Sequence, residues 1–193
     1  MPWDPTHKRS TRQRIVEAAA EAYRERGVDG ISTADVMKRA GLTHGGFYAH
    51  FASKDELVAE AIGAAATTAG AIFAKAAAGA ERHRRLSAVT DSYLSSRHRE
   101  HPETGCPIPT LAVEVARQSG VARMRMAAVI QDVLAGLTRA ANSLEPEFRQ
   151  RQAAGALALM VGGIVLARTV EDSNEADRLL DRVRQFANDA LNA

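Results

Sequence analysis

Several side chains that can form hydrogen bonds with another molecule, together with two glycines, are clustered in the sequence between residues 44 and 54. They are His44, Gly45, Gly46, Tyr48, His50 and Lys54. Imidazole, phenol and ammonium groups can donate hydrogen bonds to phosphate oxygens or contact base edges. Two glycines lower the stability of a helix by about 1 kcal/mol each relative to alanine, and they expose backbone that another molecule can approach. This combination is typical of a surface that reads a nucleic acid rather than of a purely structural helix.

The residues before this cluster predict two helices that would support it. Apolar residues at helical spacing predict a first helix over residues 10–26, which ends at Gly27. Ser32 begins a second helix, and Asp35 three residues later forms a carboxylate variant of the capping box. Gly41 ends this helix after about two turns.

A short third helix is expected to carry the polar cluster itself. Thr43 is placed to cap it, and Phe47 and Phe51, four residues apart, form its buried side. Ser53, with Glu56 as its capping-box partner, then begins a helix that extends to about residue 79. Residues 32–56 therefore predict a helix-turn-helix followed by a long linking helix.

The composition of the 193 residues favours an all-α protein with a substantial core. Hydrophobic residues make up 46% of the chain and aromatic residues 5%, and no run of alternating β-branched residues indicates strands. The net charge is +3 over residues 1–54 and −1 over the rest, which favours a polyanion bound at the N-terminal end. A single cysteine excludes an internal disulfide, and the first residues lack the apolar core of a signal peptide. We expect a cytoplasmic protein without membrane contact.

Helical patterns continue to the end of the sequence, and nine helices are expected in all. The patterns beyond residue 80 cover residues 86–94, 108–120, 126–137, 146–167 and 174–190, with a loop or short broken helix over 98–109. The longest apolar run, residues 156–167, is too short to span a bilayer and fits a buried helix. We expect a DNA-binding domain over 1–56 and a ligand-binding and dimerisation domain over 57–193.

The N-terminal 60 residues resemble the tetracycline-repressor-like (TetR) family of bacterial transcription regulators. The resemblance is carried by Ile31-Ser32-Thr33, Val36, Ala40-Gly41-Leu42-Thr43, Gly46-Phe47-Tyr48, His50-Phe51 and Ser53-Lys54-Asp55-Glu56-Leu57. It implies a ligand-responsive regulator without enzyme activity or cofactor, most simply a repressor, which leaves a palindromic double-stranded operator when a small molecule binds between the helices at 53–79 and 126–137.

The resemblance also assigns a role in DNA binding to particular residues. It places a phosphate contact at Thr33, base-edge contacts at Thr43, His44 and Gly45, and a phosphate or thymine contact at Tyr48. It makes His50 and Lys54 backbone clamps, and it makes Lys8, Arg9 and Arg12 a basic arm that reaches an adjacent groove. Gly46 stands where many members have a hydroxyl residue, so one phosphate contact is missing there.

The second half of the chain is expected to bind the effector and a second copy of itself. The candidate ligand-lining residues are Phe73, Tyr93, Cys106, Leu111, Val115, Met126 and Ile130, although such a stripe also fits an ordinary core. The candidate dimer residues are Leu159, Gly162, Gly163, Leu166, Leu180, Val183 and Phe186. The helix that begins at Pro146 becomes apolar all round over residues 156–167, which fits either a dimer interface or an intrachain core helix.

Cys106 supports two alternative functions. It lies near His98 and His101, and an imidazolium or a helix N-terminus makes a thiol reactive, so an electrophile or oxidant could switch the regulator. A thiol-dependent enzyme is the alternative from another class, but no orienting third residue and no phosphate loop accompany the cysteine. No Cys/His cluster predicts a metal site. Independently of Cys106, the sequence is also compatible with a third class of protein, a helical interaction module that does not bind DNA.

Overall fold

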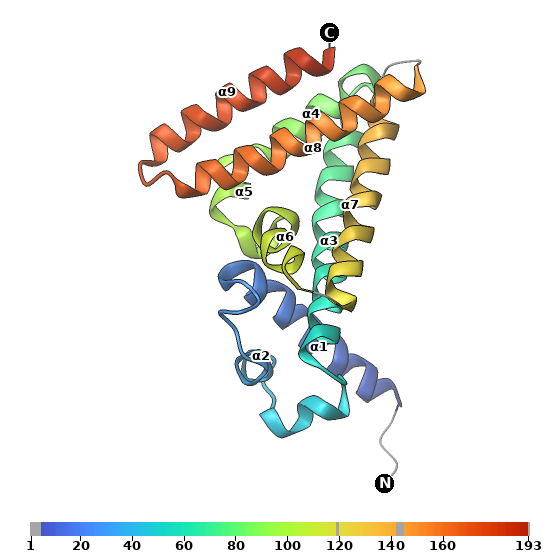
Figure 1. The fold of residues 1–193 in the computed structure, drawn as a ribbon, viewed down its shortest axis with the longest axis vertical. Coiled ribbons are helices and arrows are strands. Elements are labelled where there is room, and N and C mark those ends of the chain that lie inside the picture. Colours follow the sequence, from blue (N-terminus) through green and yellow to red (C-terminus); the bar gives the residue numbers. More distant parts are fainter. Residues whose placement is uncertain (1–4, 119, 142–144, 193) are drawn as a thin grey trace. The chain divides into compact units, whose positions relative to one another are not determined.

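The structure is a computed structural model, and it describes residues 5–118, 120–141 and 145–192. Helices account for all regular structure in these ranges, which confirms the predicted all-α class. The elements are α1 (Pro5–Arg26), α2 (Thr33–Arg39), the 3₁₀-helix η1 (His44–Ala49), α3 (Lys54–Ala78), η2 (Arg82–Arg84), α4 (Arg85–Tyr93), α5 (Ser96–Glu100), η3 (Pro102–Thr104), α6 (Ile108–Ala116), α7 (Val121–Ala140), α8 (Pro146–Thr169) and α9 (Ser173–Asn192) (Figure 1).

Two compact units divide the chain, and each draws on two separate stretches of sequence. Unit 1 comprises residues 1–67 and 102–129, and unit 2 comprises residues 68–101 and 130–193. Unit 1 therefore contains α1, α2 and η1 together with η3, α6 and the first part of α7. This division differs from a boundary at residue 56, because η3 and α6 pack against α1. A separate DNA-binding domain over 1–56 stays a prediction.

The core of unit 1 is built around α1, whose buried stripe follows the helical repeat. Ile15, Ala19 and Tyr23 are completely buried. Gly27 ends α1 with a φ of +77° and Gly41 follows α2 with a φ of +71°, so both glycines adopt the left-handed conformation that glycine tolerates best. Both helix ends lie where the sequence predicts them, whereas the start of α1 lies five residues earlier.

The capping interactions predicted from the sequence are present with one change. At the start of α2, Asp35 N–H donates to Ser32 Oγ (3.1 Å) and Ser32 N–H donates to Asp35 Oδ2 (3.1 Å), which completes the capping box. At the start of α3, Glu56 N–H donates to Ser53 Oγ (3.1 Å). The carboxylate of Glu56 accepts from the N–H of Ala52 (2.7 Å), one residue before the expected partner.

Unit 2 is organised by the hairpin of α8 and α9, against which α4 and α5 pack (Figure 1). The stretch 98–109, expected as a loop or short broken helix, is divided between α5, η3 and the beginning of α6. α5 is tied to the hairpin by two arginines. Arg99 donates to Ser173 O (3.1 Å) and pairs with Asp177 (3.0 Å), and Arg168 donates to His98 O (2.7 Å).

Two helices, α3 and α8, are long and apolar enough to cross a membrane when judged by length and composition alone. Apolar core helices of soluble proteins have the same properties. In α8 the buried positions recur along one stripe, as in Ala153, Leu157, Met160, Ile164 and Ala167, which face the interior of unit 2.

Candidate nucleic-acid interface

The short helix η1, which we call the reading element, is held in place by aromatic packing on its buried side. Phe47 and Phe51 are both 1% exposed, and their rings stack at a centroid distance of 5.7 Å. Tyr48 contacts the edge of Phe47 at 5.1 Å with an interplanar angle of 84°. The expected short helix is a 3₁₀-helix, and two glycines in its first turn give it little α-helical preference of its own. Its position therefore depends on the two buried phenylalanines.

The residues expected to face DNA bases lie on the accessible side of η1. Thr43, His44 and Gly45 are exposed, and Tyr48 has 75% of its surface exposed. Thr43 occupies the N-cap position, but its side chain makes no capping hydrogen bond, contrary to the sequence prediction. Its hydroxyl group is therefore not engaged in capping η1. A Cβ atom added to Gly45 would meet nothing within 4 Å, so the fold itself does not require glycine there.

Gly46 and Thr33 lie at the edge of this surface and are partly exposed. A Cβ atom at Gly46 would lie 3.5 Å from Met37 Cε, which is an ordinary contact. Thr33 is the first residue of α2, where backbone N–H groups lack helical partners and attract anions. We use the name reading surface for the exposed and partly exposed residues Thr33, Thr43, His44, Gly45, Gly46 and Tyr48.

His50 is buried, with only 9% of the residue's surface exposed. Its Nδ1 atom is buried and makes no hydrogen bond with the described residues. Burial, followed by the positive charges of Lys8 and Arg12, holds the pKa of His50 below its ordinary value. The burial of His50 was not expected from the sequence, and a clamp on the DNA backbone at this residue stays a prediction.

Lys54 makes contacts that were not expected from the sequence. Its ammonium group donates to the carbonyl oxygens of Val28 (2.7 Å) and Ile31 (2.8 Å), in the turn between α1 and α2. Two of its three donor hydrogens are thus used to hold this turn. Lys54 therefore braces the turn between α1 and α2, and a contact of Lys54 with the DNA backbone stays a prediction.

The basic residues of α1 separate into two kinds. Lys8 and Arg9 are exposed near the start of the helix. Arg12 instead pairs with Glu56 (2.7 Å) and Glu60 on α3. Arg12 therefore joins α1 to α3, and its membership of a basic arm stays a prediction.

Other polar contacts that hold the helix-turn-helix were missed by the sequence analysis. Arg14 donates to Ala40 O (2.7 Å) at the end of α2. Arg39 pairs with Glu25 (2.7 Å) and Glu21 (3.1 Å) on α1. These partners lie 14–26 residues apart in sequence, so helical spacing alone gives no signal for them.

The candidate ligand-lining residues fall into two groups. Cys106, Leu111, Val115 and Met126 belong to unit 1, where each is at most 4% exposed and forms part of the core. In unit 2, Phe73 and Tyr93 pack together at 5.0 Å, and the His98 ring meets Tyr93 edge-on at 4.4 Å. Ile130, also in unit 2, is partly exposed. An effector site at these residues stays a prediction.

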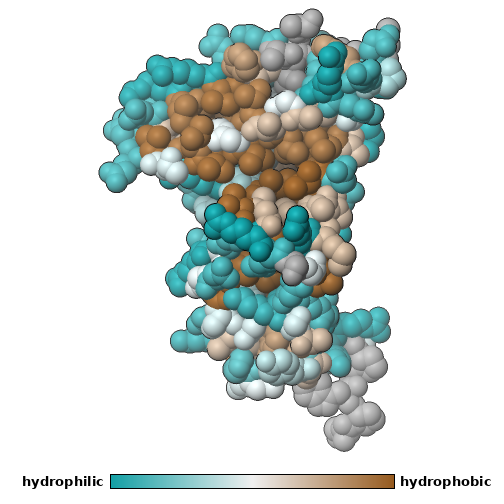
Figure 2. Space-filling view, in the orientation of Figure 1, coloured by the Kyte–Doolittle hydropathy of each residue, from teal (hydrophilic) through white to brown (hydrophobic). Residues whose placement is uncertain are grey.

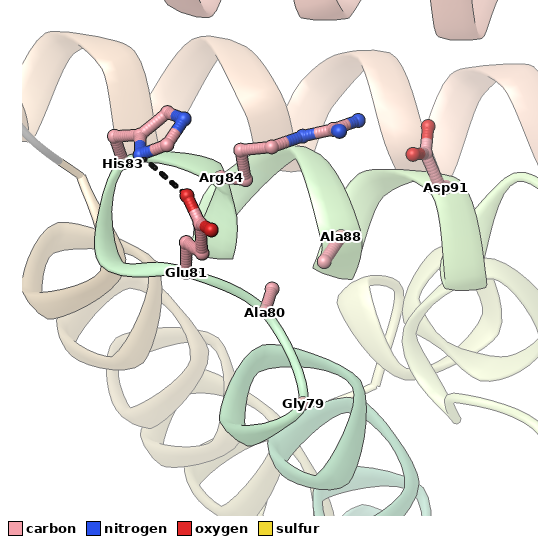
Figure 3. Close-up of a pocket in the computed structure, with 7 residues that line it drawn as sticks. All are labelled: Gly79, Ala80, Glu81, His83, Arg84, Ala88 and Asp91. Atoms are coloured by element: carbon pink, nitrogen blue, oxygen red, sulfur yellow. Dashed lines mark ion pairs between the residues drawn. The ribbon is translucent and has the colours of Figure 1, made fainter.

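One cavity of about 490 Å³ lies elsewhere in unit 2, beside the start of α4 (Figure 3). Its lining is largely polar and comprises Gly79, Ala80, Glu81, His83, Arg84, Ala88 and Asp91. His83 and Glu81 approach each other at 3.5 Å, and both side chains are mostly exposed. The cavity is open, and none of the seven candidate ligand residues lines it.

The candidate dimer residues divide between the inside and the outside of the α8–α9 hairpin. Leu166 and Phe186 are exposed by 55% and 63%, and Leu159 and Gly162 are partly exposed. Figure 2 shows apolar residues gathered over this hairpin. Gly163 and Leu180 are buried instead, and a Cβ atom on Gly163 would lie 2.8 Å from Leu94 Cδ2 and 3.0 Å from Val183 Cγ1. Gly163 and Leu180 therefore serve intrachain packing, which corrects their assignment to the dimer surface. Val183 is partly exposed, and its contact with a second copy stays a prediction.

Comparison with known proteins agrees with this geometry along most of the chain. The family model described as "Bacterial regulatory proteins, tetR family" matches residues 15–61, and the model described as "Tetracyclin repressor-like, C-terminal domain" matches residues 83–186. An HTH-type transcriptional regulator of Mycobacterium tuberculosis strain H37Rv is 29% identical over 185 residues, which cover 91% of this chain and 93% of the relative.

Solved structures have the same fold. A TetR transcriptional regulator from Chloroflexus aurantiacus superimposes with a TM-score of 0.78 at 26% identity, covering 95% of this chain and 96% of that one. AibR, solved in complex with isovaleryl coenzyme A and operator DNA, is similar in fold alone, with a TM-score of 0.64, 17% identity, and coverage of 91% and 97%. The chain belongs to the TetR family of DNA-binding transcriptional regulators.

Proposed function

We propose that this regulator is a homodimeric repressor that binds a palindromic operator through the reading surface and releases it when a small molecule binds. The observation that carries the proposal is the exposure of Tyr48 on an element pinned by the buried Phe47 and Phe51. A side chain that is exposed yet fixed in position can contact a base or phosphate with little loss of conformational freedom. Its neighbours Thr43 and Gly45 are exposed as well and lie at the N-terminal end of η1, which is the end that contacts bases in helix-turn-helix proteins.

The partner in the dimer is a second copy of this chain, and the proposed interface is the outer face of the α8–α9 hairpin. Leu166 and Phe186 supply exposed apolar area there, and Gly162 has open space around it, so a partner backbone could approach closely. A two-fold dimer matches a palindromic operator when its reading elements lie about 34–36 Å apart, or a multiple of that distance. We expect Leu166→Glu and Phe186→Glu to convert the protein to monomers in sedimentation equilibrium.

The effector would act by favouring a dimer geometry that does not fit the operator. The aromatic residues Phe73 and Tyr93, with Ile130, remain the proposed contacts for a largely apolar ligand in unit 2. AibR offers a precedent in fold, since its structure holds both an acyl coenzyme A and operator DNA. An effector found by thermal-shift screening should lower operator affinity at saturation, and an unchanged affinity would contradict the repressor mechanism.

Modification of Cys106 is the second candidate switch, and one observation favours it. Arg24, 5% exposed, donates to the carbonyl oxygen of Gly105 (2.7 Å), directly before the cysteine. A nearby cation favours a thiolate, which is the reactive form of cysteine. If this switch operates, an oxidant or electrophile should release operator from the wild-type protein but not from Cys106→Ser. A thiol enzyme would instead lose an activity in Cys106→Ser and keep its DNA binding.

The decisive experiment is selection of a duplex from a random-sequence pool by the purified protein, followed by affinity measurements at several salt concentrations. Specific binding should weaken steeply as salt rises, because phosphate contacts release counterions. Tyr48→Ala should lower the operator affinity about tenfold or more. Tyr48→Phe keeps the aromatic ring, so it should retain the share of the affinity that comes from contacts of the ring.

Gly45→Ala tests close approach of the backbone to DNA. The substitution meets open space in the protein, so the free energy of unfolding should not fall, whereas the operator affinity should. Lys75→Ala, near the end of α3 in unit 2, is the control that should leave DNA binding unchanged. Absence of any selected sequence would refute the proposed operator binding.

A further inference from the structure

Two glycines in the left-handed region of unit 1 each lie against a carboxylate from a distant part of the chain. Gly27, after α1, has a φ of +77°, and a Cβ atom there would lie 2.2 Å from Glu114 Oε1. Gly120, before α7, has a φ of +114°, and a Cβ atom there would lie 2.5 Å from Asp55 Oδ2. In both turns the missing side chain is what allows the carboxylate to reach the backbone.

Asp55 caps α7, although it is the second residue of α3. Its Oδ2 accepts a hydrogen bond from Val121 N–H (2.9 Å), and its Oδ1 accepts from Ala122 N–H (3.3 Å). These are the first two N–H groups of α7, which have no partner within their own helix. The Asp55 side chain, near the start of α3, thus accepts hydrogen bonds from the free N–H groups of a helix that begins 66 residues further along the chain.

Glu114, in α6, connects that helix to the turn before α2. Its Oε2 accepts from Val28 N–H at 2.6 Å. The carbonyl groups of the same turn, Val28 O and Ile31 O, accept from Lys54, the neighbour of Asp55. Glu114, the turn at 27–31, Lys54, Asp55 and the start of α7 are therefore joined in one connected series of contacts, which we call the carboxylate ring.

We propose that Asp55 and Glu114 are positioning residues for DNA binding, which set the orientation of the reading surface through the carboxylate ring. The ring holds the reading surface at both ends. The turn at 27–31 precedes α2, and Lys54 and Asp55 are the first two residues of α3, the next helix after η1. α6 and the start of α7 are its other members, so a shift of either helix must move the reading surface or break these hydrogen bonds. This inference rests on the proposed operator binding and names the residues that control it.

The test measures the affinity of the full-length protein for the selected operator and for versions with the two half-sites moved apart or together by one and two base pairs. Wild-type protein should prefer one spacing strongly. Asp55→Ala and Glu114→Ala should lower affinity for that spacing by tenfold or more and reduce the preference between spacings to less than threefold. Asp55→Asn, which keeps an oxygen able to cap α7, should restore most of the preference.

The matched control is Glu17→Ala, which removes one negative charge from the same unit but lies on α1, outside the carboxylate ring. Glu17 is exposed and accepts an exposed hydrogen bond from Gln13 (2.9 Å). The affinity of this variant should change equally at every spacing. A lowered melting temperature with an unchanged spacing preference in Asp55→Ala and Glu114→Ala would show a merely structural role and overturn the inference.

Hydrogen exchange on the wild-type protein gives a second measurement if the alanine variants do not fold. Operator binding should slow exchange of the amides of Val28, Val121 and Ala122, because the ring would be held in one arrangement. Unchanged exchange at all three amides would overturn the inference. Failure of the wild-type protein to bind any duplex would refute the proposed function itself, and it would be seen before any variant is made.

Discussion

The guanidinium carbon of Arg12 lies 4.1 Å from the centroid of the Phe51 ring. Phe51 in turn stacks on Phe47, whose edge contacts the exposed Tyr48. The Arg12 guanidinium group on α1 is therefore in contact with a row of three aromatic rings, the last of which, Tyr48, belongs to the reading surface. The same guanidinium pairs with Glu56 and Glu60, so Arg12 joins α1, the reading element and α3.

Arg12→Ala should therefore destabilise the protein without removing a phosphate contact. A partly exposed cation–π contact contributes about 0.5–1 kcal/mol, and each partly exposed ion pair adds at most about 1 kcal/mol. We expect the free energy of unfolding in urea to fall by about 1–2 kcal/mol. The slope of operator affinity against salt should stay unchanged in Arg12→Ala and decrease by about one in Lys8→Ala, which removes an exposed cation. A reduced slope in Arg12→Ala would restore the predicted basic arm.

Lys54→Met should unfold more readily, because it leaves the carbonyl groups of Val28 and Ile31 without their donor. Loss of a partner to a buried polar group costs about 1–3 kcal/mol, measured here as the change in urea unfolding. Lys38→Met, on the exposed side of α2, is the control and should change the free energy of unfolding by less than about 0.5 kcal/mol. If Lys54→Met kept full stability but bound DNA with a smaller salt slope, a phosphate clamp would be the correct description.

The stability of the protein should decrease as the pH falls from 7 towards 5.5, and His50 should be one cause. The pKa of His50 is lowered in the folded state, first by burial and then by Lys8 and Arg12. Below the ordinary histidine pKa of about 6.5, the unfolded chain binds a proton that the folded chain does not, so unfolding becomes easier. His50→Gln should make the pH dependence of the free energy of unfolding shallower in this window than it is in the wild-type protein.

A separate loss of stability is expected at lower pH, and it should persist in His50→Gln. Hydrogen bonds from Ala52 and Arg12 hold the pKa of Glu56 below its ordinary value, and the pKa of Asp35 is lowered by Ser32. Such carboxylates stabilise the fold above their unfolded pKa values and lose this effect as the pH falls through their folded ones. Equal slopes for wild-type and His50→Gln between pH 7 and 5.5 would contradict the role assigned to His50.

The adjacent glycines of α8 provide a matched pair. Gly163→Ala should lower the free energy of unfolding, because its Cβ would overlap Leu94 and Val183; such overpacking costs about 1–3 kcal/mol, against a gain of about 1 kcal/mol in helix propensity. Gly162→Ala meets open space and should not destabilise the chain, but it should weaken the dimer if a second copy packs there. Urea unfolding and sedimentation equilibrium separate the two effects. Equal stability of the two variants would contradict the packing described for Gly163.

The sequence by itself determined the features that depend on neighbours a few residues apart. The capping box of Ser32 and Asp35, the left-handed Gly27 and Gly41, and the burial of Phe47 and Phe51 were all predictable, because short spacing and backbone conformation decide them. The family also followed from local residues, since its signature lies within residues 31–57. These interactions exist wherever the local helix forms, so they need no knowledge of what packs against it.

Only the tertiary structure decided which polar groups are available to a partner. Lys54 and Arg12 look like DNA contacts in sequence, but partners 23–48 residues away occupy them. Gly162 and Gly163 are the same residue type on one helix, yet a step of about 100° around the axis turns one outward and the other against Leu94. Long side chains and helix faces take their roles from whatever the fold brings beside them, and sequence spacing does not contain that information.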